Sequence, residues 1–240
     1  MASMPSTRKK GLKMPLKERL NTIEKALPSE VTLVVVSKFH SPEEIMEAYE
    51  AGVRNFGENL AQELIPKYEA LPKDIHWHYI GGLQRNKVRQ IISFVDLIHS
   101  VDSVRLYEEI VRRASMVPRC VDILFQVHIA QEETKGGFAQ EEAKEAILAL
   151  CNRTEDKPYR RIRGLMGMAT LTEDSSQIKK EFSSLKKLFE EIKAHLPADE
   201  KTHFDTLSMG MSSDWELAVE EGSNLVRIGT AIMGKRRSRN

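Results

Sequence analysis

Lys38 stands where the amine of a lysine can do chemistry. It closes an apolar, mostly β-branched run over residues 31–36, and such a run without alternation is typical of a strand buried on both faces. Residues 41–44 read Ser-Pro-Glu-Glu, which predicts a helix with Ser41 as its N-cap and Glu44 near N3. The amine therefore follows a buried strand, where α/β proteins collect their ligand chemistry. A lysine that merely extends into solvent is the competing interpretation.

Small and hydroxyl-bearing residues mark a second candidate site near the carboxyl terminus. Residues 208–213 read Ser-Met-Gly-Met-Ser-Ser, and Gly229 and Thr230 close another apolar run. Hydroxyls and uncovered backbone amides bind phosphate groups, often at the start of a helix. We therefore expect Ser208, Gly229 and Thr230 to hold an anion, with residues 212–213 capping the following helix.

A lysine that faces a phosphate site allows two chemistries. It can hold a carbonyl substrate as a Schiff base, as lysine-dependent aldolases do, or hold pyridoxal 5′-phosphate (PLP) through the same linkage. Arg227 favours PLP, because it shares a strand face with Gly229 and points into the same site. A guanidinium stays charged, so beside a pyridine nitrogen it disfavours a proton there.

Alternating strand and helix patterns place these residues in one fold. Strands are predicted over residues 31–38, 53–59, 76–82, 96–100, 121–128, 162–168, 206–210 and 225–230. Helices are predicted over residues 15–27, 42–51, 60–71, 84–92, 104–114, 140–150, 175–195 and 213–221. Eight strands, each but the last followed by a helix, fit a single (β/α)8 TIM barrel, with the extra N-terminal helix covering the place of the missing one. A doubly wound sheet is the alternative, but no G-x-G-x-x-G follows the first strand.

In a barrel, the carboxyl ends of all eight strands meet at one mouth. Seven of the eight predicted ends carry polar or glycine-rich residues, so Lys38 and the expected anion site are predicted to face each other. The segment Lys135-Gly136-Gly137-Phe138 is a candidate lid over this mouth.

Composition places the chain among ordinary globular proteins. Of its 240 residues, 41% are hydrophobic and 30% charged, which suffices for a sizeable core. Lys+Arg 36 against Asp+Glu 35 leaves a net charge of +1, so no global field draws the chain to nucleic acid or an anionic membrane. No apolar run approaches the roughly 20 residues that span a bilayer.

Three segments and a reducing location are predicted. Residues 1–14 are expected to form a flexible extension, residues 15–234 one domain, and residues 235–240 a basic tail. Cys120 and Cys151 lack the spacing of a zinc site, so we expect reduced thiols, no metal, and a cytoplasmic or organelle-matrix protein.

Seven motifs, in order along the chain, resemble the pyridoxal-phosphate homeostasis protein family. They are Val-Val-Ser-Lys (35–38), Phe-Gly-Glu-Asn-x-x-Gln-Glu (56–63), Trp-His-Tyr-Ile-Gly-Gly-Leu-Gln-x-Asn-Lys (77–87), His-Ser-Val-Asp-Ser (99–103), Gly-Leu-Met-Gly-Met-Ala (164–169), Leu-Ser-Met-Gly-Met-Ser-x-Asp (207–214) and Val-Arg-Ile-Gly-Thr-x-Ile-x-Gly (226–234). Each motif alone is modest, but their order over nearly the whole chain makes the match specific.

The resemblance implies a barrel like the N-terminal domain of alanine racemase, with bound PLP and no established turnover. It implies that Lys38 holds the cofactor as a Schiff base, that Arg227 meets the ring nitrogen and that Asn59 lies beside the ring. The implied phosphate contacts are Ser208, Gly229 and Thr230, and the further implied neighbours are His78 and Met209.

The leading hypothesis is therefore a protein that holds PLP and releases it to apo-enzymes, as a monomer or weak dimer. A PLP-dependent amino-acid racemase is the second hypothesis, and it needs a second base besides Lys38. In the racemases that this barrel resembles, that base is a tyrosine from an added β-domain. None of the five tyrosines lies clearly at a strand's carboxyl end, and Tyr79 is nearest. A cofactor-free aldolase is the third hypothesis.

Overall fold

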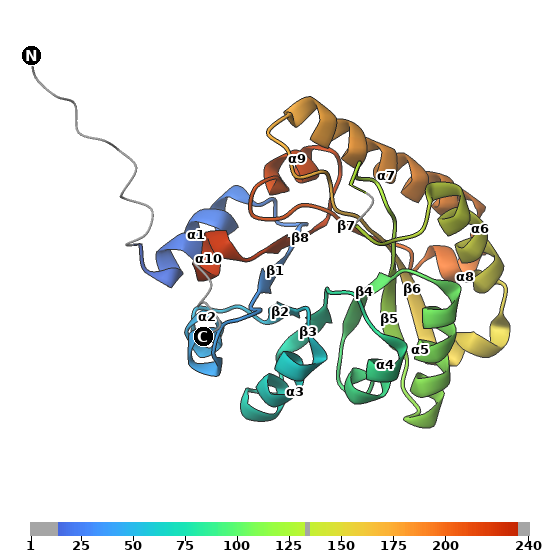
Figure 1. The fold of residues 1–240 in the computed structure, drawn as a ribbon, viewed down its shortest axis with the longest axis horizontal. Coiled ribbons are helices and arrows are strands. Elements are labelled where there is room, and N and C mark those ends of the chain that lie inside the picture. The colour runs from blue at the N-terminus through green and yellow to red at the C-terminus, as the bar shows by residue number, and fades with distance from the viewer. Residues whose placement is uncertain (1–13, 133–134, 235–240) are drawn as a thin grey trace, which may run out of the picture.

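A closed barrel of eight parallel strands, in the order β1 to β8, forms the centre of the molecule (Figure 1). The structure is a computed structural model that describes residues 14–132 and 135–234. The predicted (β/α)8 barrel is confirmed in this part of the chain. The predicted basic tail, and all but Met14 of the predicted extension, lie outside the described residues.

The strands lie where the sequence patterns predict them, although most end earlier. Their bounds are β1 Thr32–Val36, β2 Asn55–Glu58, β3 His76–Tyr79, β4 Leu97–Val101, β5 Val121–Gln126, β6 Arg160–Met166, β7 Thr206–Ser208 and β8 Leu225–Ile228. Pairing of β1 with β8 closes the barrel, with Thr32 opposite Leu225 and Val34 opposite Arg227. Because β1 ends at Val36, Lys38 belongs to the turn that follows and not to the strand.

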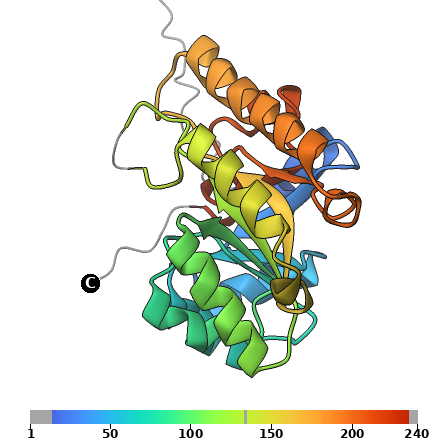
Figure 2. The same cartoon turned by 90° about the vertical axis from the view of Figure 1, so that its right-hand side faces the viewer.

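Helices lie around the barrel (Figure 1), and Figure 2 shows the side that the green, yellow and orange helices cover. Their bounds are α1 Leu16–Ala26, α2 Pro42–Glu50, α3 Ala61–Ala70, α4 Arg85–Ile91, α5 Val104–Met116, α6 Gln140–Cys151, α7 Ser175–His195, α8 Ala198–Lys201, α9 Trp215–Glu220 and α10 Thr230–Met233, with a 3₁₀ helix, η2, over Thr154–Tyr159. The predicted cap at residues 212–213 is wrong, since α9 begins at Trp215 with Asp214 as its N-cap residue. The Asp214 side chain accepts a hydrogen bond from the Met211 N–H at 2.6 Å, which holds the loop before the helix.

The last strand carries a helix of its own, which the sequence patterns did not predict. This four-residue helix, α10, lies beside α1 (Figure 1). The Arg19 side chain donates from Nε to the Ile232 carbonyl at 2.7 Å, and Leu16 and Leu20 of α1 are buried. The eighth helix is therefore present as the short α10. The N-terminal helix α1 lies beside it, and the two cover this part of the barrel wall together.

Two apolar clusters pack on the two sides of the sheet. The larger lies between the strands and the helices and includes the fully buried rings of Trp77, Tyr107 and Phe125. The smaller fills part of the barrel interior with Val34, Leu97, Leu124, Met166 and Leu225. Cavities lie at both ends of this interior. Within the described residues, no helix has the length and apolar character needed to cross a membrane.

Candidate functional site

A cavity of about 740 Å³ lies at the carboxyl ends of the strands. All eight strands contribute to its wall, through their last residues or through the loops that follow. Five of the six predicted cofactor-binding residues lie in this wall, namely Lys38, Asn59, Arg227, Gly229 and Thr230. The barrel thus brings the lysine and the expected anion site into one space, and its volume is in the range of small-molecule sites.

The Lys38 turn has an unusual backbone. Phe39 has a φ of 69°, in the left-handed region that residues other than glycine seldom adopt. Its N–H donates to Glu63 Oε2 at 2.9 Å, and the His40 N–H donates to the Ser37 carbonyl at 3.1 Å. These hydrogen bonds hold the turn in a conformation in which Lys38 lines the cavity.

Helix α2 begins directly after this turn with the predicted capping box. Ser41 Oγ accepts from the Glu44 N–H at 3.4 Å, and the Ser41 N–H donates to Glu44 Oε2 at 2.8 Å. Each side chain thus satisfies a backbone N–H that the first helical turn leaves unpaired. The prediction of Ser41 as N-cap is confirmed, and the cap fixes the far end of the Lys38 loop.

A buried ion pair fixes the near end of the same loop. Lys67 Nζ donates to Glu58 Oε1 at 2.7 Å and to the Ser37 carbonyl at 3.0 Å, while Ser37 Oγ donates to Glu58 Oε1 at 2.6 Å. Burial raises the pKa of Glu58, and the charge and hydrogen bond of Lys67 oppose that rise. The residue before Lys38 is therefore tied to both β2 and α3. No local pattern in the sequence predicts this role for Lys67.

Asn59 brings an unsatisfied polar atom to the cavity. Its side-chain Oδ1 is buried and has no hydrogen-bond partner in the structure. Gly81 packs so closely that a Cβ there would lie 2.3 Å from the Asn59 carbonyl oxygen, so only glycine fits. A buried acceptor without a partner is costly, so this side chain, which belongs to the cavity wall, lacks a hydrogen-bond donor.

Arg227 places a buried positive charge in the cavity wall. Its Nη1 donates to Ser208 Oγ and its Nη2 donates to the Gly167 carbonyl at 3.0 Å. Both acceptors are neutral, and no ion pair joins Arg227 to a carboxylate among the described residues. Burial lowers the pKa of Arg227 to about 10, so the guanidinium remains protonated at neutral pH. Two of its five N–H donors are used in these bonds, which leaves others for a ligand.

Hydroxyl and amide groups gather at the end of the cavity formed by β7 and β8. Ser212, Ser213, Gly229 and Thr230 line this end. Ser212 Oγ accepts from the Gly229 N–H at 3.1 Å and from the Ala231 N–H at 3.5 Å. These two amides lie at the start of α10 and both donate to one oxygen atom. A phosphate oxygen can take the place of that hydroxyl oxygen as their acceptor.

Three predicted residues lie elsewhere. Ser208 does not line the cavity. It is the last residue of β7, and its buried hydroxyl faces the barrel interior between Arg227 and His99. Met209 is fully buried in the larger apolar cluster. His78 lines the cavity at the opposite end of the barrel. The hydroxyls that the loop after β7 presents to the carboxyl-end cavity belong to Ser212 and Ser213.

The candidate lid borders the cavity. Lys135 and Gly136 are part of its wall, Lys135 Nζ donates to the Ala169 carbonyl, and Gln126 Nε2 donates to the Gly136 carbonyl. Lys135 also pairs with Glu132 at 3.3 Å. A second lysine thus lines the cavity, and it is tied both to Glu132 in its own loop and to the loop that follows β6.

Comparisons with known proteins give the chain its relatives. Residues 15–237 match the family described as alanine racemase, N-terminal domain. The chain is 40% identical over 206 residues to the pyridoxal phosphate homeostasis protein of Aquifex aeolicus, covering 85% of this chain and 87% of that protein. It is 39% identical over 212 residues to the protein of that name from Schizosaccharomyces pombe, covering 86% and 84%.

A solved structure shows the same similarity in three dimensions. PipY of Synechococcus elongatus PCC7942 superposes with a TM-score of 0.84 in its structure without PLP, at 36% identity. Its structure with PLP bound gives a TM-score of 0.80 at 35% identity, and both cover 92% of this chain and 100% of PipY. Because the matches span nearly the full length on both sides, the chain belongs to the pyridoxal phosphate homeostasis protein family, whose barrel is that of the alanine racemase N-terminal domain.

Proposed function

We propose that this chain binds PLP in the cavity at the carboxyl ends of the strands, holds it as a Schiff base on Lys38 and releases it to apo-enzymes. One observation carries the proposal: a single cavity is lined by a lysine, a buried guanidinium and a convergent set of amides and hydroxyls. The names of the relatives and the PLP-bound structure of PipY support it.

The residues of the cavity fit the cofactor group by group. Gly229, Thr230 and Ser212 suit the phosphate, because their N–H and O–H groups converge at one end of the cavity. Arg227 suits an unprotonated ring nitrogen, which can only accept a hydrogen bond. Asn59 offers its unsatisfied amide beside the ring. When bound, PLP supplies an aldehyde that a lysine amine can attack.

Storage and release follow from a reversible linkage. A Schiff base to Lys38 keeps the aldehyde from reacting elsewhere, and an incoming amine can displace Lys38 and take the cofactor away. Cys120 and Cys151 form no disulfide, which suits delivery in the cytoplasm or an organelle matrix. We propose that the chain acts there as a monomer or weak dimer.

The tyrosines favour a carrier over a racemase. All five lie within the described residues, and none of them lines the cavity. The Tyr79 hydroxyl lies 3.5 Å from the Gly82 carbonyl, and burial raises its pKa, so that less of it is present as the basic phenolate at neutral pH. We therefore expect no racemisation of L-alanine at enzymatic rates, and chiral chromatography after prolonged incubation with the PLP-loaded chain measures this.

The replacement Lys38→Ala tests the role of the lysine. We expect the variant to retain weak PLP binding through the phosphate end of the cavity but to lose the visible absorbance of the imine. Lys135→Ala is the matched control, because it removes the other described lysine of the same cavity wall and should keep that absorbance. Unchanged absorbance in Lys38→Ala overturns the assignment.

Borohydride trapping locates the linkage independently. Reduction of the PLP-loaded chain, followed by peptide mass analysis, should place the pyridoxyl group on Lys38. A chain that stays colourless after incubation with PLP would instead favour the cofactor-free aldolase.

A further inference from the structure

A chain of hydrogen bonds runs through the barrel interior from the guanidinium of Arg227. Arg227 Nη1 donates to Ser208 Oγ, which lies 3.1 Å from His99 Nδ1. His99 Nε2 lies 2.9 Å from His78 Nδ1, and His78 Nε2 lies 3.3 Å from Asn55 Oδ1. The residues come from β8, β7, β4, β3 and β2, so the chain crosses the barrel.

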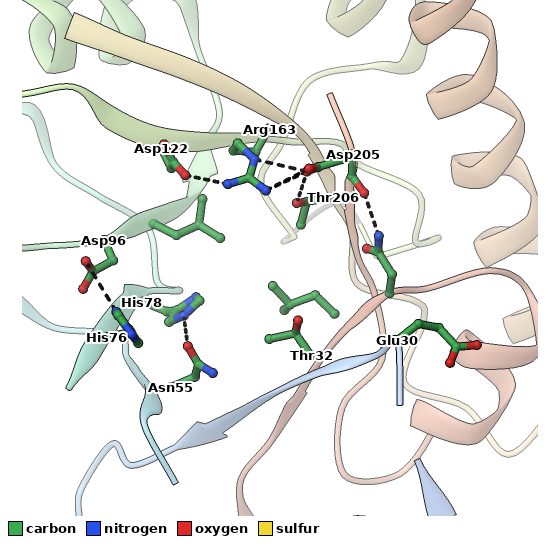
Figure 3. A pocket seen from close by; sticks show the side chains of 13 residues that line it. Glu30, Thr32, Asn55, His76, His78, Asp96, Asp122, Arg163, Asp205 and Thr206 are labelled. Carbon is green, nitrogen blue, oxygen red and sulfur yellow. Dashed lines mark hydrogen bonds and ion pairs between the residues drawn. The ribbon is translucent and has the colours of Figure 1, made fainter. Parts of the chain in front are cut away.

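This chain of hydrogen bonds joins the two ends of the barrel. Arg227 lines the cavity at the carboxyl ends of the strands, whereas His78 and Asn55 line a second cavity of about 520 Å³ at the amino ends. Figure 3 shows His78 and Asn55 joined by a hydrogen bond at this second cavity. The residues between, Ser208 and His99, are fully buried.

The donor and acceptor groups at its two ends fix the direction in which the hydrogen bonds of this chain are donated. A guanidinium can only donate and a carbonyl oxygen can only accept, whereas a hydroxyl and a neutral imidazole do both. If Ser208 accepts from Arg227, its own proton goes to His99 Nδ1, the other partner that the structure gives its oxygen. His99 must then carry its proton on Nε2 and donate to His78, which in turn donates from Nε2 to Asn55.

Both imidazoles are held neutral, as this direction requires. Burial is the largest cause that lowers the pKa of His78 to about 3 and that of His99 well below 6.5. In the second cavity, Arg163 bridges Asp122 at 2.7 Å and Asp205 at 2.8 Å (Figure 3).

We propose that Ser208, His99 and His78 are positioning residues that orient the Arg227 guanidinium toward the ring of bound PLP, through a one-way chain of hydrogen bonds anchored on Asn55 at the opposite end of the barrel. The inference rests on the proposed function, since it is PLP that Arg227 meets. It assigns a role to the second cavity: a change at Asn55 there alters the environment of the cofactor at the other end.

Histidine tautomers in the chain without PLP give the first test. Long-range ¹H–¹⁵N correlation spectra of the full chain with ¹⁵N-labelled histidine should show His78 and His99 neutral, each protonated on Nε2. A proton on Nδ1 of either residue, or a charged imidazolium, overturns the proposal, and this measurement does not depend on PLP binding.

Variants near the two ends of the hydrogen-bond chain give the second test. Ser208→Ala breaks the first link, and we expect a shifted absorbance maximum of bound PLP and release of PLP about tenfold faster, because a hydrogen bond to a charged group is lost. Ser208→Thr keeps a hydroxyl and should restore both properties. Asn55→Ala, at a half-buried site that folding tolerates better, should shift the absorbance in the same sense.

Thr32→Ala is the matched control, because Thr32 lines the same second cavity but lies outside the chain of hydrogen bonds. Wild-type absorbance and release in both Ser208→Ala and Asn55→Ala contradict the proposal. If the unaltered chain binds no PLP, the proposed function fails and the role assigned to these residues fails with it. If PLP binds and only the tautomers differ, the positioning chain alone is refuted.

Discussion

Lys67 is the residue whose loss should most disturb the turn that carries Lys38. Its ammonium pairs with the fully buried Glu58 and also holds the Ser37 carbonyl. Lys67→Met leaves Glu58 buried without its cation, and breaking a buried pair in this way costs about 3–5 kcal/mol of unfolding free energy. Urea unfolding followed by circular dichroism measures the loss.

The double replacement Glu58→Gln with Lys67→Met should recover much of that loss, because it removes the stranded charge as well. Lys179→Ala is the control, since it removes the partner of Glu220 in an exposed ion pair and should change stability little. If the single and double variants are equally unstable, the buried charge is not the cause.

His78 and His99 should make stability depend on pH. Their pKa values lie below the ordinary 6.5, at about 3 for His78, because both rings are buried. Between pH 3 and 6.5 the unfolded chain therefore binds protons that the native chain does not, and stability falls as the pH falls. We expect a loss of about 1 kcal/mol per histidine for each pH unit below 6.

Urea unfolding at pH 7, 6 and 5 measures this slope. His78→Gln replaces one imidazole by an amide that does not titrate, so its slope between pH 6 and 5 should be smaller than that of the unaltered chain. Carboxylates add to both slopes alike, and equal slopes would show that His78 is not the source.

Single residues also show where sequence patterns reach their limit. Lys38, Arg227 and Gly229 could be placed at one mouth, because a strand end and a period of two suffice for that. Ser208 was expected to face the anion, but depth along the barrel axis depends on strand length and register. The contacts of Ser208 with His99 and of Lys67 with Glu58 join separate elements, so no local pattern predicts them.

At the scale of the element, α2 depends on its capping box. Ser41→Ala removes the hydroxyl that accepts from the Glu44 N–H, and we expect a loss of about 1 kcal/mol in unfolding free energy. Because α2 begins four residues after Lys38, the variant should also exchange the amide hydrogens of residues 38–40 faster. Hydrogen exchange measured by mass spectrometry checks this.

Ser29→Ala is the control for the cap, since Ser29 is exposed and, within the described residues, its side chain bonds only to the neighbouring Glu30 side chain at 3.4 Å. It should leave stability and exchange at residues 38–40 unchanged. An effect of equal size in both variants would contradict the role of the cap.

Local chemistry determines how well each element can be predicted. The start of α2 was predicted to the residue, because a Ser-Pro-Glu-Glu sequence has one favourable structure. The start of α9 was placed too early, because Ser212, Ser213 and Asp214 are all good caps and only tertiary contacts choose among them. The helix α10 is too short to show a periodic pattern.

At the scale of the whole molecule, the barrel was predictable because eight strand and helix patterns alternate in a chain of 240 residues. The contacts between side chains inside the barrel were less predictable. The sequence indicates which faces of each strand point inward, but the continuity from Arg227 to Asn55 depends on the register of five strands.

The charges around the carboxyl-end cavity bear on how fast a ligand arrives. Among the described residues of its wall, Lys38, Lys135 and Arg227 oppose the single carboxylate of Asp102, although the chain as a whole carries only +1. At physiological ionic strength an exposed charge is screened beyond about 8 Å. A phosphorylated molecule should therefore diffuse unguided over most of the surface and be drawn inward only near the rim, so that dilute salt speeds its capture and concentrated salt slows it.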